Sequence, residues 1–250
     1  MIIEKAVNSD IPQLREIWKE SFGDSDAFVD TFFDTCTLEN SQCVRISGKP
    51  VAVLYWFDCC YEGKKLAYIY AVATDKAYRG RGLCRSLMDH THGHLKALGY
   101  SGAVLAPGNA GLFKMYAAMG YRSFCPMTLI TATATAGSAP EKIDGEEYFR
   151  LRNSLLPAGG IGQDSVLPFL RCFTEFYRGE ELALCVTRDG EKLLFQEFLG
   201  DAGKAGAVIA GLGAREGVFR YPDPKGSDRA MYLSFDGTEL KDAYLGIFMD

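Results

Sequence analysis

The sequence predicts an α/β protein, because two strand-then-helix patterns follow one another in its first half. Leu66 to Thr74 is an apolar run rich in Tyr, Ile, Val and Ala, as in a buried strand. A helical pattern follows it and stops at Gly99. Its apolar residues recur every three or four positions, at Leu83, Leu87, Met88, Leu95 and Leu98. A second short strand over 103–106 leads into a second helical pattern over 112–121.

The residues before this region predict a strand, two helices and a hairpin. Ile2 to Val7 has a strand pattern, and the amphipathic helix after it is ended by Gly23. Ser25 is placed to cap a second helix. Two further strands, over 42–47 and 50–59, are joined by a tight glycine-containing turn.

The second half predicts a separate domain. A strand over 122–133 completes the first domain, residues 1–134. A tract of small residues at 135–140 then predicts a linker to a second domain, residues 141–250. In that domain, the apolar residues over 244–249 predict a final strand.

The second domain is expected to repeat the first in a degenerate form. The dipeptide Asp-Ser at 24–25 recurs at 164–165, each time before a similar apolar pattern. Cys-Val at 43–44 recurs at 185–186, each time followed by a glycine, Gly48 or Gly190, that opens a hairpin. A strand over 192–199 runs into a glycine-containing turn and a helix, as Leu66 to Thr74 does. The later turn lacks arginine, so we expect no second phosphate site there.

Composition excludes several classes of protein. The 250 residues fit one large domain or two small ones, with the 48% apolar and 24% charged content of soluble globular chains. A net charge of −5 argues against a nucleic-acid partner, and no apolar run reaches the ~20 residues of a membrane span. The first residues lack the layout of a signal peptide. Eight cysteines without a C-x-x-C pair indicate free thiols in a reducing cytoplasm.

The turn between the strand and the helix predicts an anion site. It reads Arg79-Gly80-Arg81-Gly82-Leu83-Cys84. The first amides of a helix have no internal partner and favour negative charge, and glycine lets a phosphate approach the backbone. Arg79 and Arg81 add side chains suited to phosphate. The turn matches neither the Walker A pattern nor the Rossmann G-x-G-x-x-G pattern.

The turn resembles the pyrophosphate loop of the GNAT N-acetyltransferases, written [QR]-x-x-G-x-[GA], with Arg79 and Gly82 in place and Cys84 as a small departure from the pattern. A second family motif is a helical tyrosine followed by x-x-x-G-[FY], and Tyr116 begins such a pattern here. The stretch from 105 to 116 is similar to that of the enhanced-intracellular-survival acetyltransferases.

The resemblance implies the GNAT fold, a mixed twisted sheet flanked by helices, and makes the second domain a degenerate GNAT-like unit. It also implies acetyl-coenzyme A (acetyl-CoA) as co-substrate and no metal. The amides of the turn would hold the pyrophosphate, and the strand end would pair with the pantetheine arm, as an added strand does. The residues expected to bind the coenzyme are Ala71, Val72, Ala73, Thr74, Arg79, Gly80, Arg81, Gly82, Leu83, Cys84 and Asn109.

Tyr116 is the expected general acid, because the equivalent hydroxyl of the family can protonate the leaving thiolate. The general base is left open. The side chains near the strand that could serve are Tyr55, Asp58, Tyr68 and Tyr70, and water could also relay the proton. The carboxylate of Asp250 is a further candidate, since the enhanced-intracellular-survival acetyltransferases use the end of the chain in this way.

Three histidines, His90, His92 and His94, lie close together on the helix after the turn. His90 and His94 are four positions apart and could share a metal ion. No carboxylate or cysteine stands at ligand spacing, so we interpret them as part of a solvated helix face.

The favoured function is an N-acetyltransferase that moves an acetyl group from acetyl-CoA to a primary amine of a small molecule or a peptide. A cationic acceptor would suit the acidic chain. The alternatives are a non-catalytic acyl-CoA sensor and a structural protein with a lapsed cofactor site. Tyr116 favours the enzyme over both. Whether the second domain covers the acceptor site or forms a homodimer contact stays open.

Overall fold

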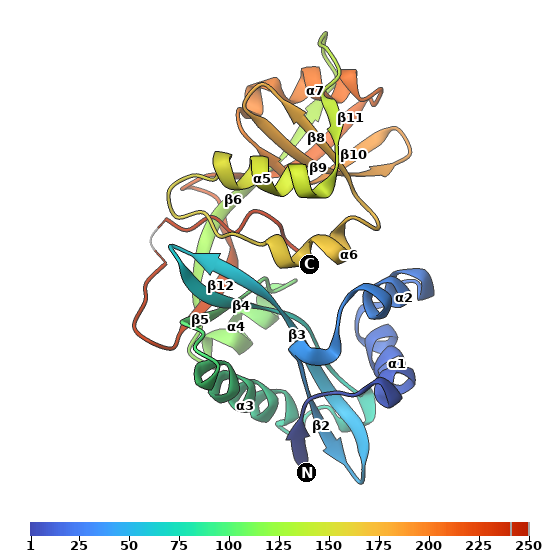
Figure 1. Cartoon of the computed structure of the whole chain (residues 1–250), viewed down its shortest axis with the longest axis vertical. Helices are drawn as coiled ribbons and strands as arrows, with labels where there is room; N and C mark the ends of the chain where they lie inside the picture. The colour runs from blue at the N-terminus through green and yellow to red at the C-terminus, as the bar shows by residue number, and fades with distance from the viewer. Residues whose placement is uncertain (241, 250) are drawn as a thin grey trace. The chain divides into compact units, whose positions relative to one another are not determined.

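The computed structural model describes residues 1–240 and 242–249, and its contacts divide the chain into two compact units (Figure 1). Unit 1 consists of Met1–Leu105, Ala118–Tyr121 and Tyr232–Glu239. Unit 2 consists of Ala106–Ala117, Arg122–Met231 and Leu240–Asp250. Strands and helices alternate in both units, so the predicted α/β class is confirmed. The division by contacts is interleaved along the chain, and the predicted boundary after residue 134 stays a prediction.

Unit 1 is built on a sheet with the spatial order β1-β2-β3-β4-β5. These strands are β1 (Ile2–Glu4), β2 (Ser41–Ile46), β3 (Lys49–Tyr61), β4 (Lys64–Thr74) and β5 (Gly102–Leu105). The first four pair antiparallel, and β4 pairs parallel with β5. Every residue from 50 to 57 of β3 is buried, which requires cover on both faces of the sheet.

Three helices of unit 1 supply that cover, namely α1 (Ile11–Phe22), α2 (Asp26–Thr35) and α3 (Leu83–Ala97). Figure 1 shows α1 and α2 on one side of the sheet and α3 on the other. The predicted helix ends are confirmed. Gly23 adopts the left-handed conformation after α1 (φ 75°), and the Ser25 hydroxyl accepts a hydrogen bond from the Phe28 amide at the start of α2.

Unit 2 holds a sheet of the order β6-β11-β10-β9-β8-β7. Its strands are β6 (Arg122–Thr133), β7 (Glu141–Ile143), β8 (Glu175–Gly179), β9 (Leu182–Asp189), β10 (Lys192–Leu199) and β11 (Glu216–Pro222). Its helices are α4 (Ala110–Ala117), α5 (Gly145–Leu155), α6 (Leu167–Leu170) and α7 (Ala205–Gly211). The last strand, β12 (Ser227–Ser234), is divided between the units after Met231.

Short 3-10 turns connect several of these elements. They are η1 (Asn8–Asp10), η2 (Leu38–Asn40), η3 (Lys76–Tyr78), η4 (Asp164–Val166) and η5 (Ala202–Lys204). Residues 135–140, predicted as a linker, pack along α7: the Thr135 amide donates to the Gly206 carbonyl, and Gly211 lies against Ala139.

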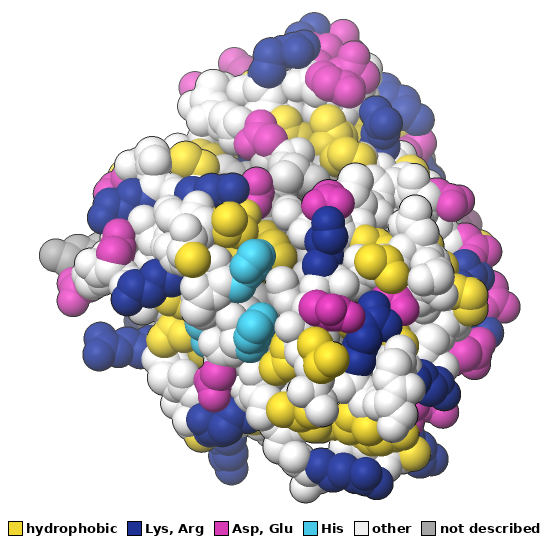
Figure 2. All heavy atoms as spheres, turned by 60° about the horizontal axis from the view of Figure 1, so that its bottom comes forward, with side chains coloured by type: hydrophobic (Ala, Val, Ile, Leu, Met, Phe, Trp, Pro, Cys, Tyr) yellow, Lys and Arg dark blue, Asp and Glu magenta, His cyan; other side chains and the backbone are white. Residues whose placement is uncertain are grey.

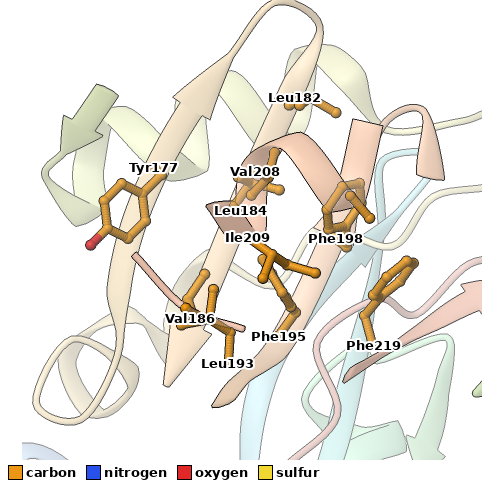
Figure 3. Close-up of a cluster of buried hydrophobic side chains, with 12 residues drawn as sticks. Tyr177, Leu182, Leu184, Val186, Leu193, Phe195, Phe198, Val208, Ile209 and Phe219 are labelled. Carbon is orange, nitrogen blue, oxygen red and sulfur yellow. The ribbon is translucent and has the colours of Figure 1, made fainter. Parts of the chain in front are cut away.

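An aromatic and aliphatic core fixes α7 against the sheet of unit 2 (Figure 3). The rings of Phe198 and Phe219 stack with centroids 4.6 Å apart, and Phe195 meets both edge-on. Leu184 and Ile209 are completely buried beside them. Burying such side chains contributes ~1.5–3 kcal/mol each.

Unit 2 repeats the strand order of unit 1. Strands β7 to β11 are neighbours in chain order, as β1 to β5 are, with three antiparallel pairs followed by one parallel pair. In both units a helix crosses between the two parallel strands, α3 in one and α7 in the other. By this strand order, β9 of unit 2 is equivalent to β3 of unit 1. Cys185 lies on β9 and Cys43 on β2, so their match in sequence is shifted by one strand.

The predicted strand over 244–249 is wrong, because among the described residues only an isolated bridge, Gly160 to Tyr244, is found there. A side chain takes the place of the neighbouring strand. The Gln163 amide donates to the Ile247 carbonyl (2.8 Å) and accepts from the Ile247 amide (3.1 Å). Leu245 to Phe248 are nevertheless buried or nearly so, and that burial produced the strand-like pattern.

Candidate cofactor and catalytic site

The predicted phosphate turn lies between β4 and α3 in unit 1. Gly80 and Gly82 both have a φ of about 75°, where glycine has no steric penalty, and α3 begins directly after Gly82. Since Gly82 has no side chain, it leaves the first amides of α3 uncapped from that position. Arg79 to Gly82 are exposed, whereas Leu83 is buried and anchors the helix. The turn therefore presents backbone amides to solvent, as an anion site requires.

The two arginines of the turn fold back onto it. Arg79 donates from Nε to the Thr74 carbonyl (2.9 Å) and from Nη2 to the Ser21 hydroxyl on α1 (3.2 Å). Arg81 donates to the Ala77 carbonyl and lies over the Tyr78 ring. A guanidinium has five N–H donors, so both side chains keep further donors for an anion.

The end of β4 carries a bulge. Tyr70 pairs with Tyr55 and Ala73 with Val53, so two residues of β4 lie opposite a single residue of β3. Ala71, the first of the two, has a φ of 48°, which is unusual for alanine. The pairing of β4 with β5 covers Leu66–Gly102, Ala67–Ala103 and Tyr68–Val104, although β4 continues to Thr74.

The pairing with β5 ends at Tyr68–Val104 and β5 itself ends at Leu105, so Ala71 to Thr74 of β4 extend beyond it. Ala71, Val72 and Thr74 are half-buried, and Ala73 is buried. Backbone donors and acceptors in a segment that extends beyond the end of its neighbouring strand are suited to pair with an extended ligand.

Asn109 and Tyr116 belong to unit 2, so the structure groups the turn with Ala71 to Thr74 and places these two residues in the other unit. The Asn109 side-chain oxygen accepts a hydrogen bond from the Leu112 amide at the start of α4, which leaves its NH₂ group to act as donor. Tyr116 lies on α4 and is 6% exposed.

The candidate bases of unit 1 differ in their surroundings. Burial raises the pKa of Tyr55 well above its usual range, so this phenol stays protonated. Asp58 accepts a hydrogen bond from the Tyr100 hydroxyl and pairs with Lys65. Tyr68 is buried and Tyr70 half-buried, the latter directly before the bulge. Asp250, the other candidate, lies outside the described residues.

The Cys84 thiol is poorly suited to act as a nucleophile or base. Its pKa is raised, chiefly by burial, so the thiol is protonated at neutral pH. Cys84 lies in the first turn of α3 and is half-buried.

The histidines lie on α3, and Figure 2 shows histidine side chains side by side at the surface. His92 shares a hydrogen bond of 2.8 Å with the Tyr121 hydroxyl, and its ring lies 5.7 Å from that of Phe235. Burial lowers the pKa of His92 to about 4. Among residues 1–240 and 242–249, no group of three or more His, Cys, Asp and Glu side chains could hold a metal ion.

The contact of α1 with the turn was not predicted. Ser21 binds Arg79, and the Glu20 carboxylate accepts a hydrogen bond from the Lys76 amide (3.4 Å). Both residues are polar positions on an amphipathic helix, and no motif marks them. A cavity of about 550 Å³ elsewhere in unit 1 is lined by residues from 5 to 11 and 33 to 39, and no predicted site residue lines it. No described helix is long and apolar enough to cross a membrane.

Residues 3–124 match the family model of the acetyltransferase (GNAT) domain. The sequence matches none of the curated proteins.

Solved structures of N-acetyltransferases share the fold of nearly the whole chain. The GCN5-related N-acetyltransferase from Kribbella flavida has a TM-score of 0.70 and 15% identity, over 94% of this chain and 72% of that chain. The corresponding protein from Anabaena variabilis has a TM-score of 0.68 and 16% identity, over 92% and 72%. Eis1 from Mycobacterium abscessus has a TM-score of 0.68 and 10% identity, over 94% and 74%. At these identities the similarity establishes the fold.

Proposed function

We propose, from the match of residues 3–124 to the family model of the GNAT acetyltransferase domain, that the protein is an acetyl-CoA-dependent N-acetyltransferase acting on a primary amine of a small molecule or peptide. The observation that carries the proposal is in unit 1. There, the bulged strand β4 extends beyond its neighbour β5 and leads, through η3, to an exposed, uncapped glycine turn at a helix start.

The turn and the strand end fit two parts of acetyl-CoA. The amides from Gly80 to Cys84 at the exposed turn and the helix start, with the remaining donors of Arg79 and Arg81, suit the pyrophosphate. The backbone of Ala71 to Thr74 suits the amide groups of the pantetheine arm. The Asn109 NH₂ group is proposed to donate a further hydrogen bond to that arm.

Tyr116 is proposed as the general acid. In the reaction, the amine nitrogen forms a bond to the thioester carbon, whose carbonyl oxygen becomes an oxyanion, and the carbonyl re-forms as the carbon–sulfur bond breaks. The departing thiolate takes the phenolic proton of Tyr116, and the ammonium formed from the amine loses its proton to a base or to water. A backbone N–H at the bulge of β4 is suited to stabilise the oxyanion between these steps.

Unit 2 is proposed to be a degenerate copy without a cofactor. In unit 2, α7 begins at Ala205 directly after η5 (Ala202–Lys204), so the connection between β10 and α7 has no counterpart of the exposed turn from Arg79 to Gly82. The pairing of β10 with β11 ends at Phe195–Phe219, and the terminal segment contacts both strands beyond this point. Tyr244 donates to Glu197 of β10, and Phe248 lies under Arg220 of β11. Calorimetric titration is expected to give one acetyl-CoA per chain.

The test of the cofactor site is thermal unfolding with and without excess acetyl-CoA. At ~100 times the dissociation constant, binding adds ~2.7 kcal/mol, a shift of several degrees for a chain of this size. We expect the shift to disappear in Arg79→Glu, where a carboxylate faces the anion. Release of coenzyme A with a panel of amines then separates an enzyme from an acyl-CoA sensor. Absence of any shift at millimolar ligand would favour a structural protein.

A further inference from the structure

The last turn of α1 is bonded to the phosphate turn of unit 1. The Arg79 guanidinium joins two elements, since Nε binds the Thr74 carbonyl at the end of β4 and Nη2 binds the Ser21 hydroxyl of α1. The Glu20 carboxylate adds a bond from the Lys76 amide. A ligand that binds the Arg79 guanidinium therefore contacts a side chain that is already hydrogen-bonded to α1.

Ser21 lies next to the turn between α1 and α2, which is itself tied back onto α1. Gly23 reverses the chain in the left-handed conformation, and the Asp24 carboxylate accepts from the Trp18 indole N–H (2.8 Å). The Trp18 ring is buried, and its centroid lies 5.8 Å from that of Tyr70. Tyr70 directly precedes the bulge residue Ala71.

Two routes thus connect the turn between α1 and α2 with the proposed coenzyme segments. One is polar and passes from Ser21 to Arg79. The other is aromatic and passes from Trp18 to Tyr70. Both are contacts within unit 1.

We infer that Ser21 is a positioning residue that, through Arg79, makes the turn between α1 and α2 respond to coenzyme binding. This inference rests on the proposed function. A bound pyrophosphate takes the remaining donors of the planar guanidinium and holds it in one orientation. The bond to Ser21 is then fixed, and the end of α1 is ordered with it. Because coupling is reciprocal, an ordered α1 end also favours the coenzyme.

The test measures the response of α1 to coenzyme A itself, so no acceptor is needed. Hydrogen exchange of the full chain is followed over residues 19–26, with and without saturating coenzyme A. In parallel, Trp56→Phe leaves Trp18 as the remaining one of the two tryptophans, and its emission reports on the same region. We expect coenzyme A to slow exchange over 19–26 and to shift the Trp18 emission.

Ser21→Ala is expected to lose the slowed exchange over 19–26 and to weaken coenzyme binding by about 2- to 10-fold, the range for one hydrogen bond. The Trp18 emission shift is expected to persist in part, because the contact of Trp18 with Tyr70 does not involve Ser21. Ser21→Thr keeps the hydroxyl and should keep the responses. Ser9→Ala, at an exposed serine before the other end of α1, should leave binding and responses unchanged. Alanine favours helix, so Ser21→Ala is expected to fold, and its unfolding midpoint is measured alongside.

Two results overturn the inference in distinguishable ways. If Ser21→Ala binds coenzyme A and still shows slower exchange over 19–26, the coupling through Ser21 is refuted while the cofactor site stands. If the native chain does not bind coenzyme A, the proposed function fails and the inference with it.

Discussion

Arg152→Met is expected to be the most destabilising change in unit 2. The Arg152 side chain is completely buried and pairs with Glu197, whose side chain is also completely buried. Nε donates to the Glu197 carboxylate at 2.7 Å, and the other nitrogens donate to the Ile161 carbonyl, the Gln163 side chain and the Leu245 carbonyl. Glu197 also accepts from the hydroxyls of Tyr148 and Tyr244.

Removing the arginine leaves a buried carboxylate with two neutral donors and no cation. The loss of one partner of a buried pair costs about 3–5 kcal/mol, a large share of the ~5–15 kcal/mol that stabilises a typical protein. Replacing both partners removes the unpaired charge. Arg152→Met with Glu197→Leu should therefore cost no more than Arg152→Met alone.

Urea unfolding of the single and double variants, followed by far-ultraviolet circular dichroism, measures this difference. Both tryptophans, Trp18 and Trp56, lie in unit 1, so their emission tells whether that unit unfolds at the same urea concentration. Arg178→Met is the matched control, because Arg178 pairs with Glu141 and Glu147 at the surface and should matter little. A double variant whose cost equals the sum of the single variants would refute the reasoning.

Three further predictions concern the chemistry, the pH dependence and the backbone. Tyr116→Phe should lower the turnover of a responsive amine by about 10²- to 10⁴-fold with little change in acetyl-CoA binding, and an unchanged turnover would remove Tyr116 as the acid. The folded state lowers the pKa of His92 to about 4, so the unfolded chain binds the proton more readily and stability should fall as the pH drops from about 6.5 to about 4. The free energies of unfolding from urea titrations at about pH 7 and about pH 5 should differ by up to roughly 2 kcal/mol more in the native chain than in His92→Gln, and equal differences would contradict this. Gly246→Ala should cost ~2 kcal/mol or more beyond Gly237→Ala. The φ of Gly246 is 80° and that of Gly237 is 86°, so both variants have similar backbone strain. A Cβ at Gly246 would meet Glu197 and Arg152, whereas a Cβ at Gly237 would meet open space. Equal unfolding midpoints for the two variants would contradict this, because they would show that the terminal segment shifts to accommodate the Cβ at little cost.

The fold of unit 1 could be predicted closely, because its signals are local. Gly23 and Ser25 have conformational and capping preferences that act within one helical turn, and the glycines of the phosphate turn have the same kind of preference. The predicted strand over 244–249 was wrong for the opposite reason, because the interactions that decide its structure are not local. An apolar pattern reports burial, and the partner that replaced a strand is the distant side chain Gln163.

The candidate site was predictable to the same extent. Motif spacing predicted an exposed glycine turn before α3, which the structure has, and it predicted Tyr116 as the general acid, which stays a prediction. It gave no sign of the bulge at Ala71, because alanine has no preference for a positive φ. It also gave no sign of the bond from Ser21 to Arg79, which depends on how α1 lies across the sheet.

The side-chain hydrogen bonds that hold residues 244–249 affect the order in which the chain folds. These hydrogen bonds join positions 84 residues apart, from Gln163 to Ile247, and 93 residues apart, from Arg152 to Leu245. Contacts that close such long loops form late, whereas the core between Leu182 and Phe219 is contiguous in sequence. During synthesis, that core can assemble while Arg152 and Glu197 still lack Tyr244 and Leu245. The buried charges of unit 2 are therefore enclosed in the final step of its folding.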